Sequence, residues 1–371
     1  MKLPTFLLFW VLALPAFGQT VRVCFTLQTP GQANDGIFIS DLDVNAGTLS
    51  EPQRAVNVNW PYYFLDLPQS STLYAVCGKD RTLFAFQSTK KGLERLEPHV
   101  QFEEGAWLCQ MTKLGNEILV NCYGSRSIAR VALAENGAPS KILQRVFFEG
   151  KSVNPARQTK SFPHSVNVGP NGLVYVCDLG ADRIWILKWS EADGERKLVP
   201  NEPFFVTARP GCGPRHMVFH PTLPVAFVNN ELTNDVTVYR IQPDGNLKDV
   251  QTIATIPEAD RGKNFIAVSE MRLTPNGKFL YVANRGHDSI SAFRVEEDGE
   301  LTFLETEPSG GRCPRGLVLD PTGRFLVVPN RNSGTILLMK IAEDGTLSPT
   351  ESHFQLPGEV PGTAILKAPE K

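Results

Sequence analysis

The segment "LYVANRGHDSISAF" (residues 280–293) decides the fold of this chain. It reads as a short apolar strand, a polar turn and a second strand in which apolar and polar residues alternate. The same shape returns in five other segments, which are "LYAVCGKDRTLFAF" (73–86), "ILVNCYGSRSIARV" (118–131), "VYVCDLGADRIWIL" (174–187), "AFVNNELTNDVTVY" (226–239) and "LVVPNRNSGTILLM" (326–339). A seventh copy with a longer loop, "VRVCFTLQTPGQANDGIFIS", begins at Val21.

The spacing of these copies is typical of propeller blades. Equivalent strand residues, from Val23 in the first copy to Val328 in the last, follow one another at intervals of 45 to 56 residues. Turn signals such as "PNG" and "EDG" separate the copies, and helical periodicity is absent. An interval of this length holds about four short strands. We therefore predict an all-β fold, a seven-bladed β-propeller of four-stranded antiparallel blades.

The two ends of the chain predict how the ring closes. The chain enters its first copy at the second strand, whereas "VPGTAILK" (360–367) has the pattern of a first strand. Pairing of the N- and C-terminal strands would complete one blade, with the C-terminal strand innermost. Such closure would protect strand edges that an open ring leaves exposed.

The first 18 residues have the pattern of a secretory signal peptide. Lys2 precedes the apolar run "FLLFWVLAL" (6–14), which is too short to span a membrane, and "AFG" (16–18) offers a cleavage site before Gln19. We expect an exported protein, periplasmic or secreted, in which residues 19–371 form one propeller domain without a membrane span. We also expect a monomer.

The composition narrows the classes of partner. The 37 Lys and Arg residues are balanced by 39 Asp and Glu, so the chain lacks the basic excess of a nucleic-acid-binding protein. Seven cysteines are an odd number, and Cys77, Cys122 and Cys177 occupy equivalent positions in three copies. Equivalent positions in successive blades are usually too far apart for a disulfide. We therefore interpret these three as small buried residues.

Polar residues should gather at one end of the central channel. The first strand of a blade lines the channel and the second runs back, so first-strand starts and second-strand ends share a face. The strand starts supply His164, Arg215, His216, Glu270 and Arg315, and the strand ends supply Asp178, Glu231, Arg285 and Arg331, with Asn230, Asn284 and Asn330. Arginine binds carboxylate and phosphate bidentately, which predicts a small anionic ligand. For Asn284 and Asn330 we favour a structural role at strand ends.

One apparent metal motif does not hold. His216 and His220 form H-x-x-x-H, but on a strand these four steps span about 13 Å, which is too far for one zinc ion. We predict no metal and no organic cofactor.

The chain resembles the lactonase seven-bladed propellers, which include propeller-type 6-phosphogluconolactonases and the carboxy-cis,cis-muconate lactonising enzyme. The strings "GPRHM" (213–217), "NEL" (230–232) and "NRGHDSI" (284–290) carry the resemblance, which covers nearly the whole mature chain. It implies that His164, Arg215, Glu231 and Arg285 form the active site. The family often has two histidines here, as P-H-x-H. In this chain "SFPHS" (161–165) places Phe162 where the first histidine would be, so only His164 remains.

These observations together predict an exported lactonase that acts on a sugar-type or other anionic lactone. His164 would be the general base on water, and Arg215 and Arg285 would hold the anionic group or the oxyanion. Glu231 would orient Arg215 or His164, and His216, Asp178, Glu270, Arg315 and Arg331 would bind substrate. Two alternatives stay open, a carboxymuconate cyclase and a non-catalytic propeller that binds a ligand.

Overall fold

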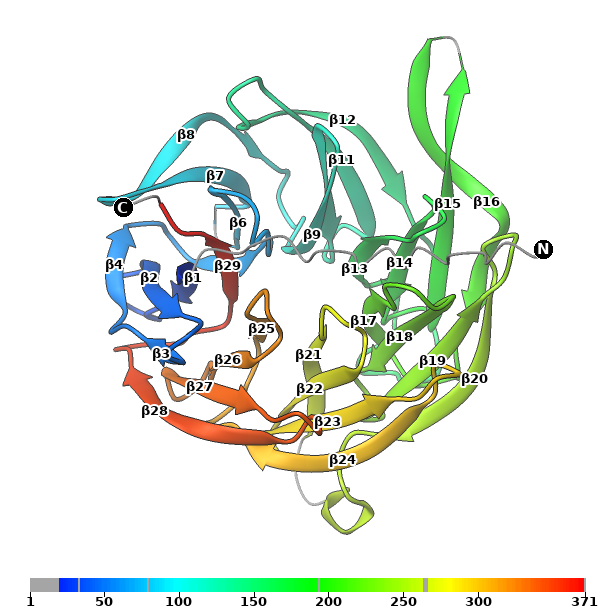
Figure 1. The fold of residues 1–371 in the computed structure, drawn as a ribbon. Coiled ribbons are helices and arrows are strands. Elements are labelled where there is room, and N and C mark those ends of the chain that lie inside the picture. The colour runs from blue at the N-terminus through cyan, green and yellow to red at the C-terminus, as the bar shows by residue number, and fades with distance from the viewer. Residues whose placement is uncertain (1–19, 33, 79, 193, 263–265, 370–371) are drawn as a thin grey trace, which may run out of the picture.

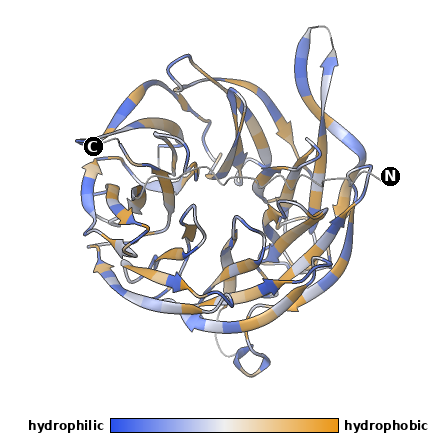
Figure 2. Cartoon of the chain, in the orientation of Figure 1, coloured by the Kyte–Doolittle hydropathy of each residue, from blue (hydrophilic) through white to orange (hydrophobic). Residues whose placement is uncertain are grey.

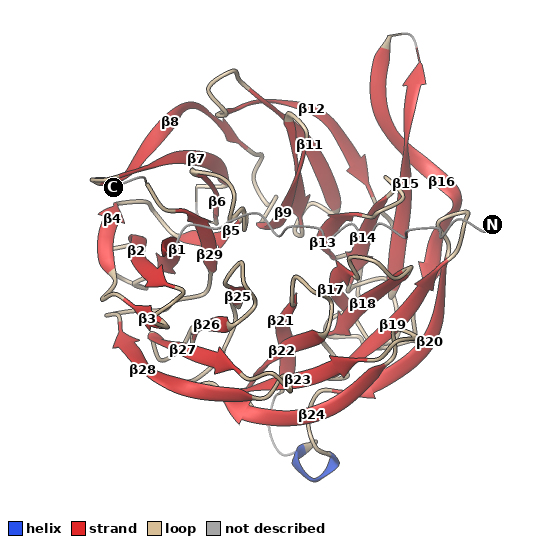
Figure 3. Cartoon of the chain, viewed as in Figure 1, coloured by secondary structure: helices blue, strands red, loops and turns tan. Residues whose placement is uncertain are grey.

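A computed structural model describes residues 20–32, 34–78, 80–192, 194–262 and 266–369. The predicted signal peptide lies outside these residues. Seven sheets are arranged around a central axis, and strands make up nearly all of the regular structure (Figures 1 and 3). The predicted seven-bladed β-propeller is confirmed. No helix in the described part of the chain is long and apolar enough to cross a membrane.

The strands of the first three blades are given in order outward from the axis, and the C-terminal strand β29 is the innermost strand of blade 1. Blade 1 contains β29 (Thr363–Lys367), β1 (Thr20–Leu27), β2 (Gly36–Asp43), β3 (Thr48–Leu49) and β4 (Gln53–Val56). Blade 2 contains β5 (Pro61–Phe64), β6 (Thr72–Cys77), β7 (Thr82–Thr89) and β8 (Gly92–Gln101). Blade 3 contains β9 (Leu108–Leu114), β10 (Glu117–Cys122), β11 (Ser127–Leu133) and β12 (Pro139–Phe147).

The remaining four blades repeat the same antiparallel order. Blade 4 contains β13 (Pro163–Val168), β14 (Val174–Asp178), β15 (Arg183–Ala192) and β16 (Glu195–Thr207). Blade 5 contains β17 (Pro214–Phe219), β18 (Val225–Asn230), β19 (Asp235–Ile241) and β20 (Leu247–Ala254), followed by the 3-10 helix η1 (Glu258–Asp260). Blade 6 contains β21 (Ala267–Leu273), β22 (Phe279–Arg285), β23 (Ser289–Val295) and β24 (Leu301–Pro308). Blade 7 contains β25 (Val318–Leu319), β26 (Phe325–Pro329), β27 (Thr335–Ile341) and β28 (Leu347–Gln355).

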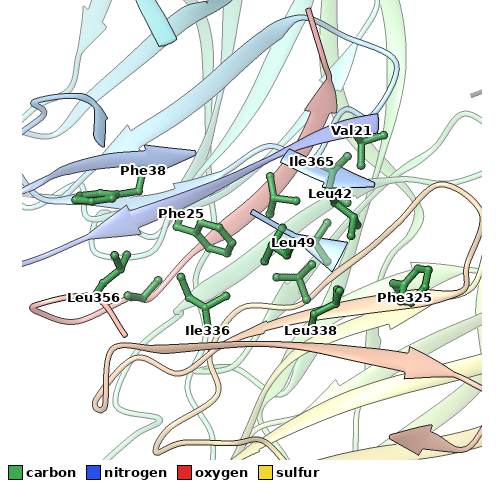
Figure 4. Close-up of a cluster of buried hydrophobic side chains, with 14 of the residues drawn as sticks. Val21, Phe25, Phe38, Leu42, Leu49, Phe325, Ile336, Leu338, Leu356 and Ile365 are labelled. Carbon is green, nitrogen blue, oxygen red and sulfur yellow. The ribbon is translucent and has the colours of Figure 1, made fainter. Parts of the chain in front are cut away.

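The ring closes as the two ends of the sequence predict. The C-terminal strand β29 lies beside β1, and Ile365 pairs with Val23 in an antiparallel register (Figure 1). Side chains from blades 1 and 7 bury the seam between them, and Phe25, Ile336 and Ile365 are all fully buried there (Figure 4). Closure therefore rests on both main-chain pairing and an apolar core between the first and last blades.

Alternation along the strands builds the cores between the blades. Hydrophobic and hydrophilic residues alternate along many strands (Figure 2), as expected for strands with two distinct faces. Cys77, Cys122 and Cys177 are buried, and all seven cysteines are free thiols. The interpretation of these three as small buried residues is confirmed.

Candidate active site

A large cavity opens where the inner strands begin and the second strands end. Its volume of about 400 Å³ falls in the usual range for small-molecule sites. It is lined by Tyr62, Trp107, Cys109, Tyr123, Ala156, Arg157, Phe162, His164, Glu231, Arg285, Arg315 and Arg331. The predicted convergence of strand starts and strand ends on one face is therefore confirmed.

The pleat of the second strands sorts the residues at their ends into two groups. We call the equivalent strand residues Val120, Val176, Val228, Val282 and Val328 of blades 3 to 7 the repeat anchors. Two residues after the anchors of blades 4 to 7 stand Asp178, Asn230, Asn284 and Asn330, all of which are buried. Three residues after the anchor stand Tyr123, Glu231, Arg285 and Arg331, all of which line the cavity. Because successive side chains of a strand point to opposite faces, the first group turns into the blade and the second turns into the channel.

Glu231 is the centre of the cavity's polar contacts. Its Oε1 accepts a hydrogen bond from Nη2 of Arg157 at 2.6 Å, and its Oε2 accepts one from Nε of Arg215 at 3.0 Å. Nη2 of Arg285 lies 3.2 Å from the same Oε2, and Nε2 of His164 lies 3.8 Å from it. One buried carboxylate thus holds three guanidinium groups that come from three parts of the chain.

A tight turn before β17 makes this meeting possible. Gly213 adopts φ +66°, and a Cβ there would approach Cγ of Leu232 to 2.7 Å, so only glycine fits. The main-chain N–H of Glu231 donates to the Gly213 carbonyl at 2.8 Å. This contact fixes Glu231 next to Arg215, which follows the turn by two residues.

The charges in the cavity favour an anionic guest. Four of the lining residues are arginines and only Glu231 is acidic. Burial alone would raise the pKa of Glu231, but the guanidiniums of Arg285 and Arg215 outweigh it and hold this pKa well below its usual range. Burial lowers the pKa of Arg285 to about 10, so this side chain is still cationic at neutral pH. The cavity therefore carries a net positive charge.

His164 is a neutral imidazole in this setting. Burial, reinforced by the charge of Arg215, lowers its pKa well below 6.5. Its Nδ1 is buried and has no hydrogen-bond partner among the described residues. The ring packs edge-on against Tyr123, with the two ring centroids 5.5 Å apart.

Aromatic side chains line the part of the cavity on blades 2 to 4. Tyr123 stacks on Phe162 with centroids 4.9 Å apart and meets Trp107 edge-on at 6.0 Å. Trp107 has a φ of +42°, a backbone conformation that a bulky residue rarely adopts, and 58% of its surface is exposed. The cavity therefore has an aromatic wall formed by these residues, and we call Arg285 and Arg331, on blades 6 and 7, its cationic wall.

A second, smaller cavity adjoins the first and is lined by three further predicted site residues, Arg215, His216 and Glu270. It is lined by Tyr62, Tyr63, Cys109, Arg215, His216, Glu270, Arg315, Gly316, Pro361, Gly362 and Thr363. Arg315 lines both cavities, and its guanidinium donates to the hydroxyl of Tyr62. Arg331 lines only the large cavity and pairs with Glu359 at 2.8 Å.

Asp178 is the one predicted site residue that the structure does not bring to either cavity. Its carboxylate accepts hydrogen bonds from the main-chain N–H groups of Phe162, Gly180 and Ala181, from the Ser161 hydroxyl and from the indole of Trp185. These donors leave no room for a substrate. We therefore correct its predicted role from substrate binding to capping the end of β14.

Sequence reasoning missed Arg157 and the aromatic wall. Arg157 lies in the β12–β13 loop, outside every repeat, so its position could not be aligned. The loop is anchored by the buried Gln158, whose side-chain amide donates to the Leu179 carbonyl at 2.9 Å. Asn284 and Asn330 donate to the neighbouring Ser291 hydroxyl and Ser309 carbonyl, which confirms their structural role.

Comparisons with known proteins agree with this fold. The family described as "Lactonase, 7-bladed beta-propeller" matches residues 23–362. A Bacillus subtilis (strain 168) protein named 6-phosphogluconolactonase is 30% identical over 296 residues, which cover 77% of this chain and 82% of that protein.

Solved structures show the same fold. A Lactobacillus plantarum protein superposes with a TM-score of 0.80 at 26% identity, covering 94% of this chain and 99% of that one. The structure described as the periplasmic gluconolactonase of Pseudomonas aeruginosa superposes with a TM-score of 0.86 at 24% identity, covering 94% of this chain and 100% of that one.

Proposed function

The chain belongs to the lactonase family of seven-bladed β-propellers, and on that premise we propose that it hydrolyses a ring-shaped lactone that carries an anionic group. The observation that carries the proposal is the large cavity, in which Glu231 gathers three arginines beside a neutral histidine. Hydrolysis of an anionic lactone uses groups that bind its charge, a base for water and a donor for the oxyanion, and the residues of this cavity are candidates for all three.

The cationic wall would bind the substrate's anionic group. Arg285 and Arg331 both line the cavity, and they come from the neighbouring blades 6 and 7. A carboxylate or a phosphate fits this chemistry equally well, because guanidinium binds both bidentately. The aromatic wall formed by Trp107 and Tyr123 would take the uncharged face of the lactone ring.

The reaction needs a neutral imidazole and a cationic donor. A histidine that is unprotonated at neutral pH can take the proton of the attacking water, and burial lowers the pKa of both His164 and His216, which keeps both rings in this state. A guanidinium next to the lactone carbonyl would stabilise the oxyanion that forms as water adds. All of these groups belong to the chain itself.

The substrate of the proposal is a sugar-type lactone outside the cytoplasm. The signal-peptide pattern in residues 1–18 supports export, and the name of the Bacillus subtilis relative supports a sugar-derived lactone. A phosphorylated sugar lactone is a cytoplasmic type of metabolite. For an exported protein we therefore favour a lactone whose anionic group is a carboxylate.

The test is proton release at constant pH from a panel of lactones with a carboxylate, a phosphate or no charge. We expect turnover of the anionic members and a loss of at least about tenfold in kcat/KM for Arg285→Gln. Arg294→Gln is the matched control, because Arg294 lies on the neighbouring β23 and pairs with Glu296 on the surface. A folded protein that opens no lactone would refute the proposal and favour cyclisation or simple ligand binding.

A further inference from the structure

The smaller cavity has room for a single water molecule. Its volume is about 20 Å³, and a cavity needs roughly 10–15 Å³ on this measure to hold one water. Polar groups of Arg215, Arg315, His216, Glu270 and Tyr62 line it, which is enough to hold a water by several hydrogen bonds. Tyr62, Cys109 and Arg315 line both cavities, so a water here would stand next to a bound substrate.

One wall of this cavity is a histidine–carboxylate pair. Nδ1 of His216 lies 2.9 Å from Oε1 of Glu270, and both side chains are at least nine-tenths buried. The same carboxylate accepts hydrogen bonds from Nη1 of Arg272 at 2.7 Å and from the main-chain N–H of Met271 at 3.1 Å. Burial would raise the pKa of Glu270, but the charge of Arg272 and the hydrogen bond from His216 hold it below its usual range.

An ionised Glu270 fixes the tautomer of His216. A carboxylate can only accept, so Nδ1 of His216 must carry the hydrogen that joins them. This leaves the lone pair on Nε2, which makes no hydrogen bond with the described residues. The other groups close to the ring are Arg215, Arg272, Tyr63 and His164. His216 therefore offers a base nitrogen, and its side chain lines a cavity sized for water.

His164 lacks these features, although its ring lies only 5.3 Å from that of His216, centroid to centroid. Its Nδ1 is buried without a partner, and its Nε2 lies 3.8 Å from a carboxylate that three guanidiniums already share. A proton on His164 would add a positive charge beside Arg215 with little compensation. A proton on His216 would be balanced by Glu270 at hydrogen-bond distance.

We infer that His216 and Glu270 hold the attacking water in the small cavity and that Nε2 of His216 accepts its proton. The inference rests on the proposed lactone hydrolysis. The water oxygen bonds to the carbonyl carbon as one of its O–H bonds breaks, and the carbonyl electrons move to an oxyanion that Arg315 is placed to stabilise. When the ring C–O bond breaks, the leaving oxygen takes the proton from His216. Glu270 is a positioning residue, and His164 contacts the substrate.

Kinetics of matched histidine variants test the assignment. We expect His216→Ala to lower kcat by at least about 100-fold with a smaller change in KM, and His164→Ala to act more on KM. Added imidazoles should restore part of the rate of His216→Ala, more strongly for imidazoles of higher pKa. Glu270→Gln should lower kcat without abolishing it. His220→Ala is the control, since His220 lies next to β17, is buried, and bonds to its own turn and to the Gly277 main chain without lining either cavity.

The result that would overturn the inference is a His216→Ala variant that keeps its kcat within about twofold, or base rescue seen in His164→Ala alone. Nitrogen-15 NMR of the histidine rings gives a second measurement that needs no turnover. We expect the tautomer with hydrogen on Nδ1 of His216 and magnetisation transfer from water to that ring. The opposite tautomer would overturn the inference even in an active enzyme. A wild type that hydrolyses no lactone would instead refute the proposed function.

Discussion

Replacing Glu231 by glutamine should destabilise the folded protein by about 3–5 kcal/mol, because the change leaves buried positive charges without their partner. Arg215 and Arg285 have side chains that are only 3% and 13% exposed, and both contact Oε2 of Glu231. Arg157 is a third exposed and can turn to solvent. The cost therefore comes mainly from two guanidiniums, and glutamine keeps the shape of the side chain while removing only its charge.

A matched variant, Glu359→Gln, measures what the loss of a partly exposed ion pair costs, so that the cost of leaving buried charges unpaired can be told apart from it. Arg331 and Glu359 pair at 2.8 Å in the same part of the molecule, but their side chains are 32% and 28% exposed. Partly exposed pairs usually contribute no more than about 1 kcal/mol. Glu359→Gln should therefore lower the free energy of unfolding by less than about 1 kcal/mol.

Urea unfolding of wild type and both variants measures these free energies. A second arm adds sulfate, which should stabilise Glu231→Gln more than wild type, because the uncompensated arginines would bind the anion. If Glu231→Gln costs no more than Glu359→Gln, or if sulfate stabilises wild type and Glu231→Gln equally, the three-arginine arrangement does not carry the buried charge that we describe.

Three further perturbations test other parts of the structure. Trp107→Ala should raise KM for a ring lactone with little change in kcat, whereas Phe147→Ala, which removes an aromatic side chain that is 62% exposed outside the cavity, should change neither constant. Burial lowers the pKa of His216 from 6.5 to about 4, so the unfolded chain binds this proton at a higher pH than the folded chain does. As the pH falls from 6.5 to 4, the free energy of unfolding of wild type should therefore drop by about 3 kcal/mol through this group. His216→Asn should not show this part of the drop, which urea unfolding at each pH would measure. Ile365→Ala should cost about 2–5 kcal/mol, since it leaves a cavity in the seam that closes the ring, and calorimetry should show a matching drop in Tm.

The fold could be predicted from the sequence because the propeller repeats its signal. Each blade places an apolar strand, a turn and an alternating strand in the same order, so a weak pattern in one copy is reinforced by the others. The closing strand was predictable for the same reason, since "VPGTAILK" supplies the one first strand that the N-terminal copy lacks.

The site could be predicted in its repeated part only. Asp178 and Glu231 both stand at a second-strand end, but they lie two and three residues after their anchors. Because successive strand residues point to opposite faces, this one-residue difference separates the strand-end cap, Asp178, from the cavity residue, Glu231. The prediction treated both positions as one set. Arg157 belongs to a loop of unique sequence, and the low pKa of His164 depends on burial and on the charge of Arg215, so neither could be obtained from the repeat.

The most direct test of the central claim compares two lactones with the same ring, one neutral and one bearing a carboxylate, in the chain from Gln19 onward. The account predicts that kcat/KM favours the anionic lactone by at least about tenfold and that Arg285→Gln abolishes most of this preference. Equal rates for the two lactones, or a preference for the neutral one that survives in Arg285→Gln, would contradict it.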